Sequence, residues 1–136
     1  MDKALVDAFR ATDYLVCLDE VTWASIHVDQ PLPAPLQALV GARSWGFITA
    51  WNPRSEPCSP EDNLDAQRGL LAALRSSPEA VIYPALGVGA NGWSEPSLFV
   101  IGPDLPTLDA LGQRYEQNAY VHGQGSEIAH LRLLRP

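Results

Sequence analysis

The fold is decided by the stretch Ser44-Trp45-Gly46-Phe47-Ile48-Thr49-Ala50-Trp51 and by the pattern that follows it to residue 122. The apolar run predicts a buried strand, which Asn52-Pro53 ends. The next residues, Ser59-Pro60-Glu61-Asp62, predict the start of a helix. Ser is a favoured N-cap, Pro fits the first turn, and acidic side chains complement the helix dipole. This helix is expected to run to about residue 75.

Further segments complete a strand–helix–strand–strand–helix–strand order up to residue 122. They are strands at 80–84, 97–101 and 119–122 and a helix at 107–115. This is the split βαβ order of ferredoxin-like domains. Outside it we expect a helix at 2–11, a hairpin within 14–28, a short helix near 35–40 and a last strand at 128–134. The prediction is an α+β fold in a single domain over 1–136, with a ferredoxin-like core at residues 44–122 and a mostly antiparallel sheet.

Composition argues against two classes of partner. The chain has 16 acidic and 9 basic residues, a net charge of -7 and a single lysine, Lys3, so a nucleic-acid partner is not expected. No apolar run approaches the roughly 20 residues of a membrane span. The N-terminus lacks the basic start and apolar stretch of a signal peptide, which predicts a cytoplasmic protein without a membrane partner.

The sequence predicts neither a metal nor a cofactor. Cys17 and Cys58 lie in no metal-ligating spacing, and His122 and His130, which fall on adjacent predicted strands, have no spaced carboxylate. Residues 87–92 match G-x-G-x-x-G, but a strand follows them. A dinucleotide site needs a helix there, so the glycines predict a hairpin loop.

Polar side chains at predicted strand ends mark the candidate site. Glu95 is the candidate catalytic residue, because burial between Trp93 and Pro96 would raise its pKa and suit it to acid–base chemistry. Alternatively, Glu95 accepts hydrogen bonds from neighbouring loop amides or pairs with Arg54. The candidate ligand-binding residues are Trp51, Asn52, Arg54, Asn63 and Trp93. The sequence leaves two positions open for Gln117 and Asn118. They lie either at the same edge of the sheet as the candidate site or at the opposite edge, outside the site.

These short motifs resemble a known family. They are Thr49–Pro53, Asn63, Trp93–Ser97, Gly112 and Gln117–Ala119. The pattern is similar to that of DUF3293, a bacterial family of unknown function, over about residues 44–122. The resemblance implies a bacterial cytoplasmic protein and supplies no mechanism.

Three functions remain open from the sequence, and whether the protein is an enzyme is one of the open points. The first is binding of a small polar ligand through amides, Arg54 and Glu95. The second is a small metal-independent hydrolase or isomerase that uses Glu95 as a base. The third is a protein-interaction domain anchored by Trp51 and Trp93. A deep pocket beside Glu95 would favour the first two, and a flat aromatic patch the third.

Overall fold

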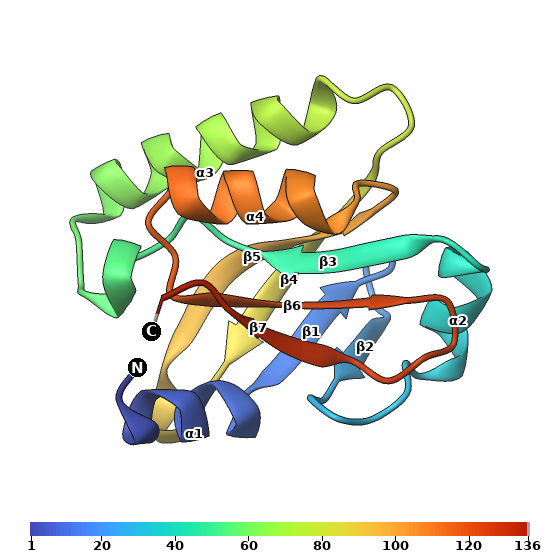
Figure 1. Cartoon of the computed structure of the whole chain (residues 1–136), viewed down its shortest axis with the longest axis horizontal. Helices are drawn as coiled ribbons and strands as arrows, with labels where there is room; N and C mark the ends of the chain where they lie inside the picture. Colours follow the sequence, from blue (N-terminus) through green and yellow to red (C-terminus); the bar gives the residue numbers. More distant parts are fainter. Residues whose placement is uncertain (136) are drawn as a thin grey trace.

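The structure, a computed structural model, describes residues 1–135 and is built on one seven-stranded sheet (Figure 1). The strands are β1 (Asp13–Cys17), β2 (Trp23–Ile26), β3 (Ser44–Ile48), β4 (Val81–Val88), β5 (Ser94–Ile101), β6 (Ala119–Gln124) and β7 (His130–Leu133). Their order is β2-β1-β4-β5-β3-β6-β7, and every pairing is antiparallel. The predicted α+β class with a mostly antiparallel sheet is confirmed.

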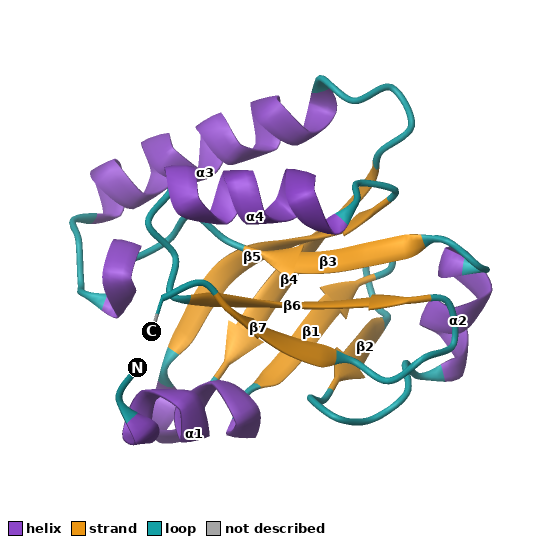
Figure 2. Ribbon diagram, in the orientation of Figure 1, coloured by secondary structure: helices purple, strands orange, loops and turns teal. Residues whose placement is uncertain are grey.

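Helices cover both sides of this sheet (Figure 2). They are α1 (Lys3–Ala11), α2 (Ala34–Val40), α3 (Pro60–Arg75) and α4 (Leu105–Arg114). The two longer helices, α3 and α4, lie side by side on one face, where Leu70, Leu74 and Leu108 join a buried cluster. On the other side α1 and α2 lie at opposite ends of the sheet, and Leu36 and Val40 of α2 complete a second core.

The segment 44–122 supplies β3, α3, β4, β5, α4 and β6 in the predicted order. In the sheet these strands run β4-β5-β3-β6, so β5 lies between the two strands that α3 connects. The N-terminal hairpin joins at β4 and the last strand joins at β6, which widens the sheet as expected. The ferredoxin-like name for this core stays a prediction.

Local signals explain where α3 begins. The Ser59 hydroxyl accepts a hydrogen bond from the Asp62 amide at 3.1 Å, and Pro60 occupies the first turn. The inward face of α3 is not apolar along its whole length. Leu64 is 45% exposed, whereas Asn63 is 2% exposed. The first turn of α3 meets polar strand ends rather than the apolar core, so an amide lies inside at this position.

The β4–β5 hairpin is longer than expected. β4 continues past Pro84 to Val88, and β5 already begins at Ser94. Proline lacks the N–H that a neighbouring strand would bind. Here β4 pairs with β1 only from Ala85 onward, so Pro84 lies just outside that ladder. The glycine-rich segment forms the tip of this hairpin, as predicted, and it carries β5 to the cavity described next.

Candidate ligand-binding site

A cavity lies at the end of the sheet where β3 stops and β5 begins. Its outer chamber encloses about 310 Å³ between α1, the loop after β3 and the tip of the β4–β5 hairpin. Its lining residues are Leu5, Ala8, Phe9, Ala11, Thr12, Asn52, Ser55, Gly89, Ala90, Trp93 and Glu95. Most of this wall is apolar, and a few polar groups gather at one side, as is usual for small-molecule sites.

An inner chamber of about 50 Å³ continues from the outer one toward the sheet. Six residues line both chambers: Phe9, Thr12, Asn52, Ser55, Trp93 and Glu95. Buried residues of the strands and of their ends form its floor, among them Tyr14, Phe47, Ser97 and Gln117. The two chambers therefore form one hollow with an apolar mouth and a more polar inner end.

Asn52 is held in place by a reciprocal amide pair. Its backbone N–H donates to Asn63 Oδ1 at 2.8 Å, and Asn63 Nδ2 donates to Asn52 Oδ1 at 2.8 Å. The Cys58 amide also donates to Asn52 Oδ1, at 3.1 Å. Because its oxygen is fully engaged, the Asn52 amide directs its Nδ2 toward Glu95 Oε2, 3.5 Å away. Asn63 braces the site and does not line either chamber.

Glu95 is the charged side chain of the cavity. It lies opposite Gly87 in β4, which in turn lies opposite Tyr14 in β1, so the carboxylate sits beside a small residue. The Asn52 contact is its single side-chain hydrogen bond in the described structure, and its length makes it weak. Burial raises the pKa of Glu95 to about 7, although the Asn52 amide lowers it in part. A carboxyl group with this pKa changes charge near neutral pH.

Trp93 forms one wall of the cavity, and Gly89 makes room for it. A Cβ at Gly89 would lie 2.7 Å from the Trp93 ring, so a larger residue would displace the indole. The hairpin tip is closed by the Gly89 amide, which donates to the Trp93 carbonyl at 2.8 Å. Trp93 is 41% exposed and lines both chambers. Gly89 thus fixes an aromatic side chain beside Glu95.

Like Asn63, the predicted ligand-binding residues Trp51 and Arg54 lie outside both chambers. The backbone of Trp51 is bound by Thr49 Oγ1 and by Gln117 Nε2, and its ring does not line the cavity. Arg54 donates to Glu116 Oε1 at 2.8 Å and makes no contact with Glu95. The pairing of Arg54 with Glu95, one of the alternatives from the sequence, is therefore wrong.

Gln117 and Asn118 lie at the same sheet edge as Asn52, which decides between the two positions left open by the sequence. Gln117 Nε2 donates to the Trp51 carbonyl at 3.2 Å, and Asn118 Nδ2 donates to Ser55 Oγ at 2.9 Å. The reason is that β6 runs antiparallel to β3, so the start of β6 lies beside the end of β3. Gln117 reaches the floor of the inner chamber, and Asn118 supports the rim.

The loop after β3 is also strained. Asn52, Arg54 and Ser55 have left-handed backbone angles (φ 46°, 58° and 59°), and so does Glu116 (φ 54°), which binds the Arg54 amide at 2.7 Å. Such angles are unfavourable for most residues other than glycine and gather at functional sites. Here they turn Asn52 and Ser55 toward the cavity.

Sequence reasoning missed the contribution of α1. Phe9 and Thr12 line both chambers, and Leu5 and Ala8 line the outer one. The one-turn spacing of Leu5 and Phe9 predicts an apolar helix face but does not reveal that a cavity lies beneath it. Thr12 is fixed because its hydroxyl donates to the Ala8 carbonyl at 2.7 Å. Ser55 was missed as well, since its role depends on the strained loop.

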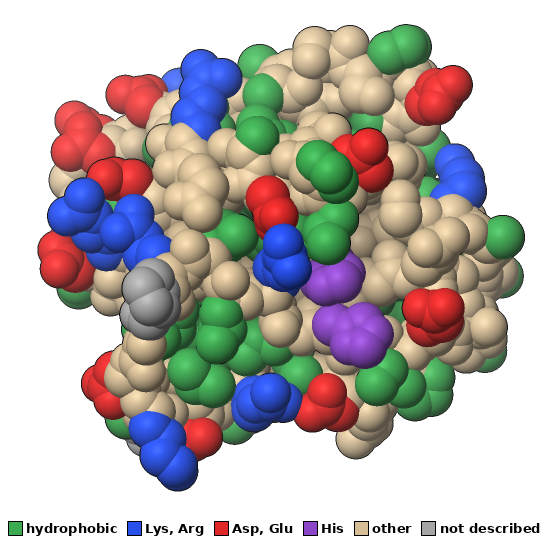
Figure 3. Space-filling view, viewed as in Figure 1, with side chains coloured by type: hydrophobic (Ala, Val, Ile, Leu, Met, Phe, Trp, Pro, Cys, Tyr) green, Lys and Arg blue, Asp and Glu red, His purple; other side chains and the backbone are tan. Residues whose placement is uncertain are grey.

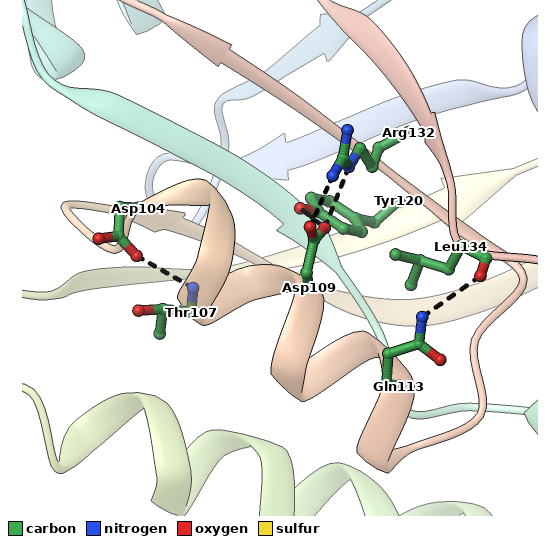
Figure 4. Close-up of polar contacts among 7 residues, drawn as sticks. All are labelled: Asp104, Thr107, Asp109, Gln113, Tyr120, Arg132 and Leu134. Atoms are coloured by element: carbon green, nitrogen blue, oxygen red, sulfur yellow. Dashed lines mark hydrogen bonds and ion pairs between the residues drawn. The ribbon is translucent and has the colours of Figure 1, made fainter.

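A second polar cluster joins α4 to β6 and β7 on the face of the sheet that α3 and α4 cover (Figure 4). Asp109 accepts hydrogen bonds from the Tyr120 hydroxyl at 2.7 Å and from Arg132 Nη2 at 2.7 Å. The Arg132 hydrogen bonds hold the pKa of Asp109 below its usual value. His122 and His130 lie on the adjacent strands β6 and β7, as predicted, and their ring centroids are 5.5 Å apart. Figure 3 shows two histidine side chains next to each other on this face of the molecule. Burial lowers the pKa of His122.

Residues 1–135 contain no group of three or more His, Cys, Asp or Glu side chains arranged to hold a metal ion. None of the helices in this part of the chain combines the length and the apolar character that a membrane crossing requires.

Comparison with known proteins gives one match. The family model described as "Protein of unknown function (DUF3293)" matches residues 48–120. The matched range includes the loop after β3, all of α3 and the β4–β5 hairpin, and therefore most of the polar residues around the cavity. Searches of curated proteins and of solved structures gave no match to the chain.

Proposed function

The chain belongs to the DUF3293 family, whose description assigns no activity, and from the site we propose that it binds a small molecule in the cavity beside Glu95. The observation that carries this proposal is the hollow itself. About 310 Å³ of space has mostly apolar walls and a few convergent polar groups, the composition of a ligand site rather than of a packed core.

The polar groups support a ligand with a polar head. Asn52, Ser55, Thr12 and Glu95 meet where the two chambers join, so a head group placed there would reach several donors and acceptors. An apolar body would then lie along Phe9 and Trp93. A cavity of this volume favours a small ligand over a flat protein surface, and Trp51, one of the two expected aromatic anchors, lies outside it.

A fragment screen monitored by NMR tests the proposal. Fragments that bind should shift the indole N–H signal of Trp93 and the amide signals of Gly89 and Thr12. Ala8→Trp, which places a bulky ring in the outer chamber, should abolish these shifts. Ala4→Trp is the matched control, since Ala4 is exposed on the same helix and lines neither chamber. Fragments that bind Ala8→Trp as well as the parent protein would contradict the proposal.

A catalytic role for Glu95 is the second candidate, and the raised pKa of its carboxyl group favours it. With a pKa of about 7, the carboxylate is available near neutral pH and is basic enough to accept a proton from a bound substrate. This reading predicts a hydrolase or isomerase whose rate rises through pH 7. Glu95→Gln should abolish turnover of a hit from the screen without preventing its binding. Unchanged turnover in that variant would reject the role.

A further inference from the structure

The charge of the cavity limits the chemistry of its ligand. Among the described residues that line the two chambers, Glu95 is the one charged side chain, and no Lys, Arg or His joins it. The arginines nearest in sequence to the lining residues are engaged elsewhere, Arg10 with Asp29 and Arg54 with Glu116. An anionic ligand would therefore meet a carboxylate with no compensating cation, which is unfavourable in a poorly solvated site.

The hydrogen bonding of Glu95 is also incomplete. An ionised carboxylate has about four acceptor positions. In the described structure Glu95 uses one of them, for the long contact from Asn52 Nδ2 at 3.5 Å. The neighbouring strand position is Gly87, which has no side chain to donate. A ligand head with several N–H donors would fill the vacant acceptor positions and supply the missing positive charge.

Aromatic side chains line the same two chambers as Glu95. Trp93 and Phe9 line both chambers, and Tyr14 and Phe47 line the inner one. The faces of aromatic rings attract cations, most strongly in places from which water is excluded. The inner chamber, at about 50 Å³, has room for a head group of a few non-hydrogen atoms. The outer chamber is large enough for an apolar body that packs against α1 and Trp93.

We infer that the ligand is an organic ammonium ion, whose charged head lies beside Glu95 among aromatic rings and whose apolar or aromatic body fills the outer chamber. This inference rests on the proposed binding function and adds the charge and shape of the ligand to it. The overall negative charge of the protein, -7, would attract such a cation toward the surface as well.

Three probes that share one aromatic body test the head group: 2-phenylethylammonium, 2-phenylethanol and phenylacetate. Affinities are measured by NMR titration of the Trp93 indole signal at about pH 8, where Glu95 is mostly ionised. The ammonium probe should bind at least about tenfold more tightly than the alcohol, and phenylacetate most weakly. Glu95→Gln should remove the preference for the ammonium head over the alcohol.

Calorimetry adds a measurement that nonspecific binding would not reproduce. At about pH 6 most Glu95 carboxyl groups carry a proton. Binding of the ammonium probe should move that proton from Glu95 to the buffer. Titrations in buffers of different ionisation enthalpy give the number of protons released on binding. The other titratable side chains that line the cavity, Tyr14 and Tyr120, stay neutral in this range because burial raises the pKa of both. The alcohol, and any probe bound to Glu95→Gln, should release no proton.

The outcomes separate the inference from the proposed function. Equal or tighter binding of the alcohol or of phenylacetate would overturn the inference and leave a binding function in place. If none of the three probes binds in the millimolar range but fragments of other chemistry shift Trp93, the inference alone is wrong. If the fragment screen is empty too, both are wrong. Melting curves of Glu95→Gln show whether the variant is folded.

Discussion

Two carboxylates in this molecule, Asp109 of α4 and Glu95 in the cavity, have opposite surroundings although they are the same chemical group. Asp109 receives hydrogen bonds from Tyr120 and from two nitrogens of Arg132, all at 3.1 Å or less (Figure 4). Glu95 receives one, at 3.5 Å, and has no cation beside it. The pKa of Asp109 is accordingly lowered, and that of Glu95 is raised to about 7.

This difference separates a structural group from a candidate functional one. The charge of Asp109 is neutralised within the fold, where it ties α4 to β6 and β7. The charge of Glu95 remains uncompensated in the free protein. Natural proteins tolerate such instability where a site needs it. If this reading is right, substitutions in the two regions should change stability in opposite directions.

The largest loss is expected for Asp109→Ala. It removes charge-assisted hydrogen bonds and leaves the Tyr120 hydroxyl without its partner, which should reduce the free energy of unfolding by about 2 kcal/mol after allowance for partial exposure. This corresponds to a melting temperature lower by roughly 7 °C. Asp65→Ala, in an exposed pair with Arg68 at 3.8 Å, is the control and should change little.

The pH dependence sharpens this test. Because the folded-state pKa of Asp109 is lowered, its contribution is present above the unfolded-state pKa and is lost as the pH falls through the folded-state value. The parent protein and Asp109→Asn should therefore converge in stability under acid conditions. A difference between them that is independent of pH would show that packing, and not charge, gives Asp109 its effect.

The second-largest loss of stability is expected for Asn52→Ala, because Asn52 both lines the cavity and holds its own loop in place. Asn52 faces Glu95 but also fastens its own loop through Asn63 and Cys58. Removing the amide leaves Asn63 Nδ2 with one long contact, and alanine tolerates the left-handed φ of 46° poorly. We expect a loss of about 1.5–2 kcal/mol in urea unfolding. Asn52→Gly relieves the backbone and should lose less; equal losses would rule out strain as a contributor.

Glu95→Gln should have the opposite sign. Its folded-state pKa of about 7 lies above the ordinary value of 4.5, so ionisation weakens the folded state as pH rises between the two. The amide variant lacks this cost. Its free energy of unfolding should exceed that of the parent by on the order of 1–2 kcal/mol at about pH 8, reduced for partial exposure, and match it near pH 4.5. Urea unfolding at several pH values measures the gain, and a loss at every pH would make Glu95 a structural residue.

The parts of the site that the sequence predicts are those set by residues close together in the chain. The start of α3 follows from capping residues and proline, which act locally, whereas β3 ends at Ile48 and not at Trp51 as the sequence predicted. The raised pKa of Glu95 agrees with the prediction from the sequence, which rested on burial of its carboxyl group between Trp93 and Pro96. These features depend on residues adjacent in the chain.

Features that depend on distant segments were not predictable. In its role as a cavity wall, α1 brings residues 5–12 next to residues 52–55 and 89–95. No motif in the sequence of α1 indicates this contact. The inward turn of Asn63 and the exposure of Leu64 reflect polar strand ends that cover the first turn of α3. Arg54 is a third case. Its backbone is left-handed, and its partner Glu116 lies 62 positions away in the chain.

Arg54→Ala is expected to have the smallest effect and tests where the site ends. Arg54 and Glu116 form an exposed pair, so its loss should change the free energy of unfolding by less than about 0.5 kcal/mol. Arginine and alanine both lack the backbone freedom of glycine at φ 58°, so the strain largely cancels between them. Since Arg54 lines neither chamber, the affinity for 2-phenylethylammonium should not change. If Arg54→Ala binds phenylacetate more weakly but the ammonium probe equally well, Arg54 is part of the site and binds the anion. Unchanged titrations of both probes would limit the site to the cavity around Glu95.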